Sequence, residues 1–218
     1  MNFFEAMLER KVTVKFLNKE VDDKLIGLLL HSATYAPSAG NLQEWRFVVV
    51  RDEKIKEKLS RFAKDEKRIM EAPVNIVVCS DVEATEAKYG EKGDDYAIQD
   101  ASFVAMTILI GARSLGLGGV LIRNFDVEKI IELLDLPKVF KPSFIIPIGY
   151  VAEEEEIKRI PNENLTSMNR YGRKYEAEIT PVIDYMKELF EKGRKESKKT
   201  GKKKIFYDFE EFLRKLSA

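Results

Sequence analysis

The chain has 218 residues, 44% of them hydrophobic and 10% aromatic, a composition typical of a globular protein with a substantial core. Its 37 Lys and Arg match 37 Asp and Glu, so no net charge favours nucleic acid or a membrane surface as a partner. One cysteine excludes an intrachain disulfide, and one histidine, His31, excludes paired-histidine metal sites. The single histidine leads us to expect no bound metal. No apolar run nears the ~20 residues of a membrane span, so we expect a cytoplasmic protein. The many Lys and Glu, with few Gln, resemble the composition of thermophile proteins.

The first part of the chain predicts alternating helices and strands. Apolar residues at helical spacing indicate the helices, and β-branched runs indicate the strands. Cys79 lies in such a run with no basic neighbour, which favours a buried thiol over a reactive one. The predicted elements are helices over 2–10 and 22–34, a strand over 45–51, a helix over 53–62 and a strand over 74–80.

The alternation continues to residue 151 and then loosens, which predicts one core followed by an extension. Glycines at 116, 118 and 119 end a long helix, and Asp126 is placed to cap the next one. The predicted elements are a helix over 94–115, a strand over 120–123, a helix over 126–134, a strand over 143–151 and an acidic turn over 153–156. Further on we expect a polar loop over 159–175, a helix over 181–191, a basic run over 194–204 and a helix over 206–216.

The most informative segment runs from Ala36 to Phe47 and reads APSAGNLQEWRF. Pro37 disfavours helix at the residue before it, and Gly40 and Asn41 tolerate unusual backbone angles. We expect a short loop of exposed N–H groups and side-chain amides beside a rigid strand, which suits binding of a planar polar heterocycle. Trp45, at the exit, is expected in the core rather than stacked on a ligand.

Common nucleotide-binding motifs are missing from the sequence. It has no Gly-x-x-x-x-Gly-Lys-Ser/Thr, and the glycines over 116–119 close a helix instead of opening one. A P-loop or Rossmann site is therefore disfavoured, and a cofactor would bind in another way.

Three segments together resemble the nitroreductase family of flavin mononucleotide (FMN) enzymes, over about residues 3–150. They are RKVTVKF at 10–16, the loop PSAGNLQEW at 37–45, and the long helix with its glycine exit followed by IRNFD at 122–126. The loop matches the family pattern Pro-Ser-x-x-Asn-x-Gln-Pro-Trp except that Glu44 takes the place of proline. The closing PIGY at 147–150 supports the resemblance.

The resemblance implies an α+β fold with three α-β-α layers, a central mostly antiparallel sheet and an intertwined homodimer. It implies tightly bound FMN between subunits, with residues 1–176 as the FMN-binding domain and 177–218 as a helical arm on the partner. Hydride would pass from NADH or NADPH through flavin N5 to a small-molecule acceptor, a nitroaromatic, quinone or free flavin, in a ping-pong sequence. No catalytic side chain is implied, because the cofactor carries the chemistry.

The same resemblance assigns the cofactor contacts at the start of the chain. Arg10 and Lys11 match the residues that hold the phosphate, although they could merely cap the first helix. Val12 replaces the usual serine and Val14 the usual arginine, so another cation should stand near the flavin pyrimidine. We hypothesise that Arg68 supplies this charge; the alternative is a solvated arginine. Asp65 aligns with an amide position.

Further contacts are implied by the loop, by a later strand end and by the C-terminal region. Asn41 is expected at a ring carbonyl or ribityl hydroxyl, with a simple turn role as the alternative. A backbone N–H at Arg123 or Asn124 would donate to N5, and Arg173 is the favoured C-terminal contact to the phosphate. The implied contacts are Pro37, Ser38, Ala39 and Asn41 from the neighbouring subunit, then Leu121, Ile122, Arg123, Asn124 and Arg173.

Several alternatives stay open on the sequence alone. Cousins in the superfamily dehalogenate iodotyrosine or fragment the flavin, and a flavin-binding protein with little turnover would carry the same motifs. These cousins differ in a lid, here near 81–96, that is too generic to interpret. The basic run over 194–204 could bind nucleic acid, although a solvated tail explains it more simply, and we expect no nucleic-acid partner.

Overall fold

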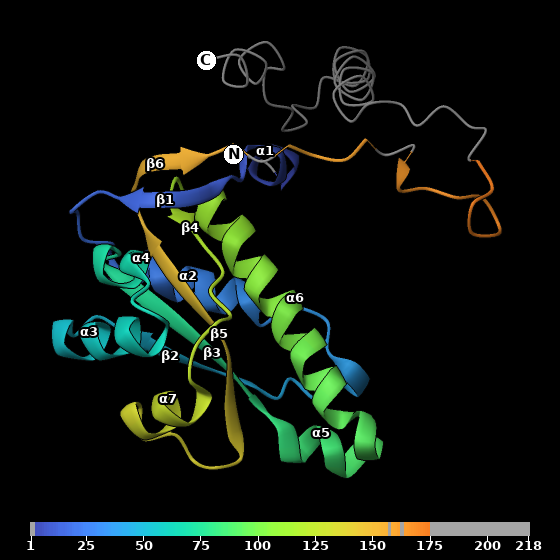
Figure 1. Ribbon diagram of the computed structural model, residues 1–218, viewed down its shortest axis with the longest axis horizontal. Coiled ribbons are helices and arrows are strands. Elements are labelled where there is room, and N and C mark those ends of the chain that lie inside the picture. Colours follow the sequence, from blue (N-terminus) through green and yellow to red (C-terminus); the bar gives the residue numbers. More distant parts are fainter. Residues whose placement is uncertain (1–2, 157, 162–163, 175–218) are drawn as a thin grey trace, which may run out of the picture. The chain divides into compact units, whose positions relative to one another are not determined.

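The computed structural model describes residues 3–156, 158–161 and 164–174 (Figure 1). The chain divides into two compact units, residues 1–157 and 158–218. The helices expected over 181–191 and 206–216, the basic run and the proposed arm lie outside the described residues. The domain division at 176 therefore stays a prediction.

The first unit is built on a four-stranded antiparallel sheet with the order β2-β3-β5-β4 (Figure 1). Val77 of β3 faces Ile145 of β5 in this register, so two β-branched runs form the centre of the sheet. The strands are β2 (Trp45–Val50), β3 (Val74–Asp81), β4 (Gly118–Gly119) and β5 (Phe140–Gly149). The predicted antiparallel sheet is confirmed.

Helices cover both faces of this sheet, because alternate residues of each strand point to opposite sides. Ile76 and Val78 pack with α2 (Asp23–Ala33) and α6 (Gly93–Ser114) in one apolar cluster. Val77 and Cys79 pack in a second cluster with α3 (Glu53–Phe62), α4 (Lys67–Glu71) and α7 (Val127–Leu133). Burial raises the pKa of the Cys79 thiol to about 12, which agrees with the expected structural role. The three layers predicted from the sequence are therefore confirmed.

A separate two-stranded sheet pairs β1 (Val12–Phe16) with β6 (Val151–Glu155), and α1 (Phe3–Glu9) precedes it. The acidic turn predicted over 153–156 is wrong, since Glu153 to Glu155 lie in β6. Lys15 faces Glu153 across the pair, and Arg113 of α6 holds the Glu154 carboxylate at 2.9 Å. These cations offset the acidic run and let it extend as a strand.

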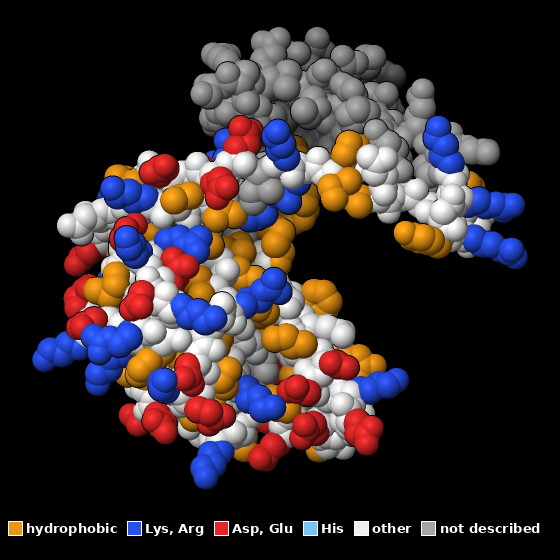
Figure 2. All heavy atoms as spheres, in the orientation of Figure 1, with side chains coloured by type: hydrophobic (Ala, Val, Ile, Leu, Met, Phe, Trp, Pro, Cys, Tyr) orange, Lys and Arg blue, Asp and Glu red, His pale blue; other side chains and the backbone are white. Residues whose placement is uncertain are grey.

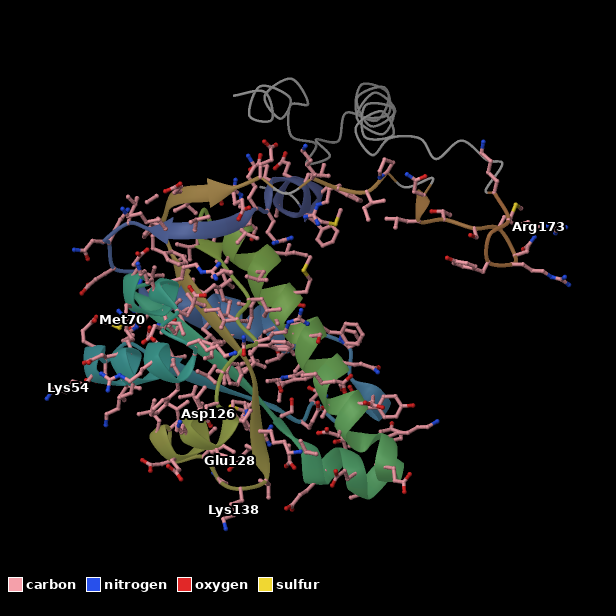
Figure 3. All side chains as sticks on the ribbon, in the orientation of Figure 1. Lys54, Met70, Asp126, Glu128, Lys138 and Arg173 are labelled. Atoms are coloured by element: carbon pink, nitrogen blue, oxygen red, sulfur yellow. The ribbon has the colours of Figure 1, made fainter. Side chains whose placement is uncertain are left out.

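The glycine exit of α6 behaves as the sequence predicts. Gly116 has a φ of 75°, while its N–H donates to Arg113 O and Leu117 N–H donates to Ala112 O. This pattern is a Schellman cap. At the next helix, the Asp126 side chain accepts from Lys129 N–H and caps α7, also as predicted (Figure 3 labels Asp126).

The strand expected over 120–123 is wrong in its position. The ladder to β5 forms at β4, Gly118–Gly119, and Ile122 makes only an isolated bridge to Ile145. A Cβ at Gly119 would crowd Ile148 and Leu109, so the missing side chain allows the close approach. The sequence also did not predict α4, α5 (Val82–Tyr89), or the 3-10 helices η1 (Ala39–Asn41) and η2 (Gly90–Lys92).

Candidate functional site

The loop between α2 and β2 adopts the unusual backbone expected from its composition. Gly40, Asn41 and Gln43 all have positive φ, at 54°, 56° and 51°. The Ser38 hydroxyl accepts from Gln43 N–H at 3.0 Å, and Asn41 Oδ1 accepts from Gln43 Nε2 at 3.1 Å. This geometry leaves the Asn41 amide nitrogen as a donor at the loop surface. Trp45 is 4% exposed and packs in the core, as predicted.

Two distant side chains hold this loop in place. Asp100, in the middle of α6 and 3% exposed, accepts from Ala39 N–H at 2.8 Å. Lys88 of α5 donates to Gly40 O at 3.0 Å. A side chain at position 40 would collide with Lys88 Nζ and the Tyr89 hydroxyl. The loop is therefore fixed from α5 and α6, and the predicted lid segment contributes to it.

Glu44, which replaces the proline of the family pattern, is 3% exposed. Neither of its carboxyl oxygens has a hydrogen-bond partner among the described residues. Burial raises the pKa of Glu44, and the nearby carboxylates of Asp100 and Asp81 raise it further. Burial raises the pKa of Asp100 as well. Two of the carboxyls beside this loop are thus held toward their neutral form.

A pocket of about 530 Å³ brings together three of the predicted cofactor residues, Val14, Asp65 and Arg68. It lies where β1 and β6 meet the turn before α4, and charged side chains of both signs surround it. The other lining residues are Lys15, Lys64, Glu66, Lys67, Glu71, Glu153 and Glu155. The volume falls within the ~300–1,000 Å³ typical of cofactor pockets.

The turn that carries Asp65 is strained and its neighbour Arg68 is paired. Lys64 and Asp65 both have left-handed φ values, 59° and 58°, which side chains other than glycine seldom adopt. Arg68 donates from Nε and Nη2 to the two oxygens of Glu66, at 2.7 and 2.6 Å. This pairing lowers the pKa of Glu66 and raises the pKa of Arg68. Strain of this kind is often found at binding sites.

The remaining predicted contacts occupy two other parts of the first unit. Lys11 is exposed and Arg10 half-buried just before β1, while Val12 of the same strand faces Glu155. The N–H and carbonyl of Ile122 both pair with Ile145, at 2.9 and 3.0 Å. This pairing leaves the following peptide groups, at Arg123 and Asn124, as the ones suited to donate to a ligand.

Arg173 belongs to the second unit, whose described residues form a tight turn (Figure 3). Met168 N–H donates to Arg173 O at 2.9 Å, and Ser167 pairs with Lys174. Its predicted phosphate contact stays a prediction.

Sequence reasoning missed three residues that position the site, namely Lys88, Asp100 and Glu66. Asp100 left a signal, because it is a carboxylate among the apolar positions of α6. Lys88 and Glu66 left none, since each looks like an ordinary surface charge.

Among the described residues no cluster of His, Cys, Asp or Glu side chains could hold a metal ion. In the same part of the chain, every helix is too short or too polar to cross a bilayer.

Comparison with known proteins identifies the family. The model of the nitroreductase family matches residues 7–69 and 63–150. The chain belongs to this family. A protein of Methanothermobacter thermautotrophicus, named a putative NADH dehydrogenase/NAD(P)H nitroreductase, is 34% identical over 157 residues, 70% of this chain and 79% of that protein. A Thermus thermophilus protein named NADH dehydrogenase is 33% identical over 178 residues, 68% of this chain and 86% of that protein.

The fold agrees with that of a solved relative. The structure of an FMN-dependent nitroreductase from Clostridium difficile superimposes with a TM-score of 0.67 at 26% identity, covering 77% of this chain and 99% of the other. The family predicted from the three sequence segments is therefore confirmed, together with its α+β architecture.

Proposed function

We propose that this nitroreductase-family protein is an FMN-dependent NAD(P)H oxidoreductase that reduces nitroaromatic, quinone or flavin acceptors in a ping-pong sequence. The observation that carries the proposal is the pocket at β1 and α4, which collects Val14, Asp65 and Arg68 from segments far apart in the chain. The names of the relatives from M. thermautotrophicus and C. difficile support a nicotinamide donor and an FMN cofactor.

The residues present fit FMN in chemistry as well as in volume. Arg10 and Lys11 would bind the phosphate through charge-assisted hydrogen bonds. Asp65 and Arg68 would meet the polar edge of the ring, and the N–H groups at Arg123 and Asn124 would face N5. Bound FMN would supply the redox chemistry, taking a hydride from NADH or NADPH and passing it to the acceptor.

Arg68 has a defined electrostatic role in this proposal. A cation beside the flavin pyrimidine stabilises the negative charge of the reduced ring, and Val14 cannot provide one. Glu66 holds the Arg68 guanidinium by two hydrogen bonds and so fixes its direction. Arg68→Ala should weaken FMN binding and lower its reduction potential. Arg61→Ala, an exposed ion-paired arginine of α3, is the matched control. Unchanged affinity and potential in Arg68→Ala would refute this role.

A homodimer is the second part of the proposal. Large apolar side chains are exposed on α6, where Phe103 is 47% and Met106 41% exposed, and Figure 2 shows hydrophobic side chains on this flank. On α1, Phe3 and Phe4 are exposed too, and α1 contacts α6. Apolar patches of this kind often mark subunit interfaces. A second copy on this flank would bring its loop over 37–41 to the flavin. Light scattering that gives a monomer mass at micromolar concentration would contradict this.

The function is tested by a visible absorbance scan of the purified protein, followed by anaerobic NADH or NADPH. We expect a flavin spectrum that bleaches with one donor and recovers on adding an acceptor. A flavin that stays oxidised would contradict the reductase and favour a dehalogenating, flavin-fragmenting or low-turnover relative. A colourless protein that FMN cannot reconstitute would mean that Val12 and Val14 mark a lost site.

The cytoplasmic location stays a prediction.

A further inference from the structure

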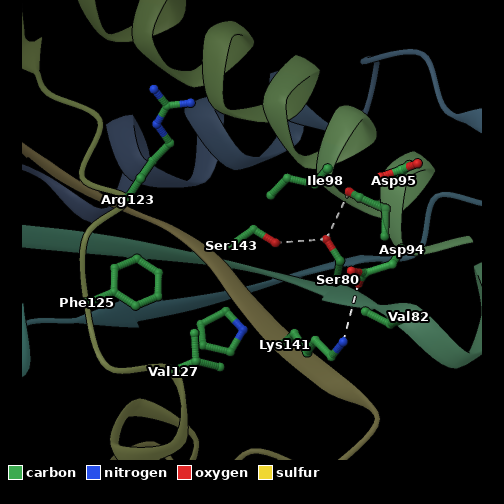
Figure 4. Close-up of a pocket in the computed structure, with 12 residues that line it drawn as sticks. Ser80, Val82, Asp94, Asp95, Ile98, Arg123, Phe125, Val127, Lys141 and Ser143 are labelled. Carbon is green, nitrogen blue, oxygen red and sulfur yellow. Dashed lines mark hydrogen bonds and ion pairs between the residues drawn. The ribbon is translucent and has the colours of Figure 1, made fainter.

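A second pocket, of about 300 Å³, lies beside Arg123 (Figure 4). Four segments of the first unit meet there: the end of β3, the start of α6, the start of β5, and the chain that leads into α7. Its walls combine hydroxyls, charges and apolar groups. Among the residues that line it are Ser80, Ile98, Arg123, Phe125, Val127 and Ser143.

The Arg123 side chain differs from the other arginines described between residues 3 and 156. Each of the others has a hydrogen bond, an ion pair or another electrostatic contact. Arg123 is exposed, and its guanidinium has none there. A planar cation with all its donors available, at the wall of a pocket, is suited to bind a carboxylate or another anionic oxygen.

The charges of this pocket are separated along its length. Figure 4 shows Arg123 at one end and Asp94 and Asp95 at the other. Lys141 pairs with Asp94 at 3.3 Å, so the positive charge without a partner belongs to Arg123. An anionic group is therefore favoured at the Arg123 end and disfavoured at the other.

Between these ends the pocket offers a surface for a ring. The Phe125 ring and the Val127 side chain line one side, and Ile98 lies across from them (Figure 4). In the middle, the Ser80 hydroxyl donates to Ala97 O at 3.3 Å and accepts from the Ser143 hydroxyl at 3.3 Å, so the two hydroxyls offer acceptor lone pairs to a ligand. The volume is at the lower limit for ligand pockets, which fits a one-ring compound and not a dinucleotide.

We propose that this pocket binds the electron acceptor, and that the acceptor is a one-ring aromatic compound with a carboxylate or similar anionic group held by Arg123. The proposal rests on the proposed function and deepens it, because it names the substrate class. Arg123 is then the residue that determines specificity, and its own backbone N–H is one of the two predicted to donate to N5. The ring lies against Phe125, with the anionic group at the guanidinium.

The test compares two acceptors of nearly equal shape, 4-nitrobenzoate and the neutral 4-nitrobenzamide. The ratio of their kcat/KM values is measured in the wild-type holoenzyme, in Arg123→Gln and in Arg61→Gln. Arg61→Gln removes the same charge from an exposed position on α3. We expect Arg123→Gln to lower the benzoate-to-benzamide ratio about tenfold, the loss typical of one charge-assisted hydrogen bond. Arg61→Gln should leave the ratio unchanged. Using a ratio cancels any general effect on the flavin.

A further variant, Phe125→Leu, should weaken both acceptors to a similar extent and leave the ratio intact. An unchanged ratio in Arg123→Gln, or an equal fall in Arg61→Gln, would overturn the proposal. Calorimetric titration with 4-nitrobenzoate separates its failure from that of the proposed function. If the wild type binds no FMN or oxidises no NAD(P)H, the proposed function fails. The Arg123-dependence of 4-nitrobenzoate affinity then still decides whether the pocket binds this ligand.

Discussion

The loop over 37–44 and the turn over 63–68 both carry predicted flavin contacts, yet the protein holds them by opposite means. Beside the loop, Glu44 and Asp100 are buried, and burial raises the pKa of each. In the turn, Glu66 is partly exposed, and its hydrogen bonds to Arg68 lower its pKa. The loop therefore depends on burial and hydrogen bonds to neutral groups, and the turn depends on an ion pair.

This difference gives the two regions opposite responses to pH. The pKa of Glu44 is raised in the folded state. Its contribution to the stability of the fold is therefore complete below the ordinary glutamate pKa, and this contribution is lost as the pH rises through the raised pKa. The pKa of Glu66 is lowered in the folded state. Its contribution to the stability of the fold is therefore present above the ordinary glutamate pKa, and this contribution is lost as the pH falls through the lowered pKa. Both contributions are present together only at pH values between the lowered pKa of Glu66 and the raised pKa of Glu44.

The largest effect is expected at Asp100, the buried acceptor for Ala39 N–H. Asp100→Ala leaves that N–H without its partner and should lower the free energy of unfolding by about 1–3 kcal/mol. It should also weaken FMN retention, because the loop loses its anchor. Asp100→Asn keeps an acceptor oxygen and should lose less on both measures. Equal denaturant midpoints for the two variants would show that this hydrogen bond does not hold the loop.

Glu44→Gln should change how stability depends on pH. The amide has the shape of the carboxylic acid but cannot ionise, so the variant avoids a buried charge next to Asp100 and Asp81. Thermal midpoints of wild type and variant should be close near pH 5 and diverge in favour of the variant as the pH rises to 8. If the difference between the two thermal midpoints stays constant across this pH range, Glu44 does not become a buried charge without a partner.

Lys64→Gly should stabilise the protein by about 1 kcal/mol, since glycine adopts the left-handed φ of 59° without strain. The matched control is Lys58→Gly, an exposed position inside α3, where the same change should cost about 1 kcal/mol. Urea unfolding measures both. If Lys64→Gly is also destabilising, the turn before α4 is not strained.

The smallest effect is expected for Glu66→Gln, which breaks the partly exposed pair with Arg68. Such pairs contribute about 0–1 kcal/mol at neutral pH. The loss should shrink as the pH falls through the lowered pKa of Glu66, the reverse of the trend at Glu44. The difference in unfolding free energy between wild type and variant, measured from pH 3 to pH 7, checks this. A loss that grows at low pH would contradict the role assigned to the ion pair.

Sequence patterns were sufficient where a local interaction decides the structure. Helical spacing placed α2 and α6, the Asp126 cap placed the start of α7, and Gly116 placed the end of α6, because each depends on neighbours within about five residues. They failed where a strand needs a distant partner. The acidic run over 153–155 became β6 only because Lys15 and Arg113 lie opposite it, and β4 shifted to the two glycines that fit against β5.

By itself, the sequence determined the family and the α+β layers, and it predicted most of the residues that we propose at the flavin. Only the tertiary structure decided what holds them: Asp100 and Lys88 on the loop, and Glu66 on Arg68. It also left the Arg123 side chain without a partner among the described residues. Periodicity and short motifs report which residues share a face or a turn. A hydrogen bond between residues 39 and 100 exists only once the chain has folded, since nothing local brings the two groups together.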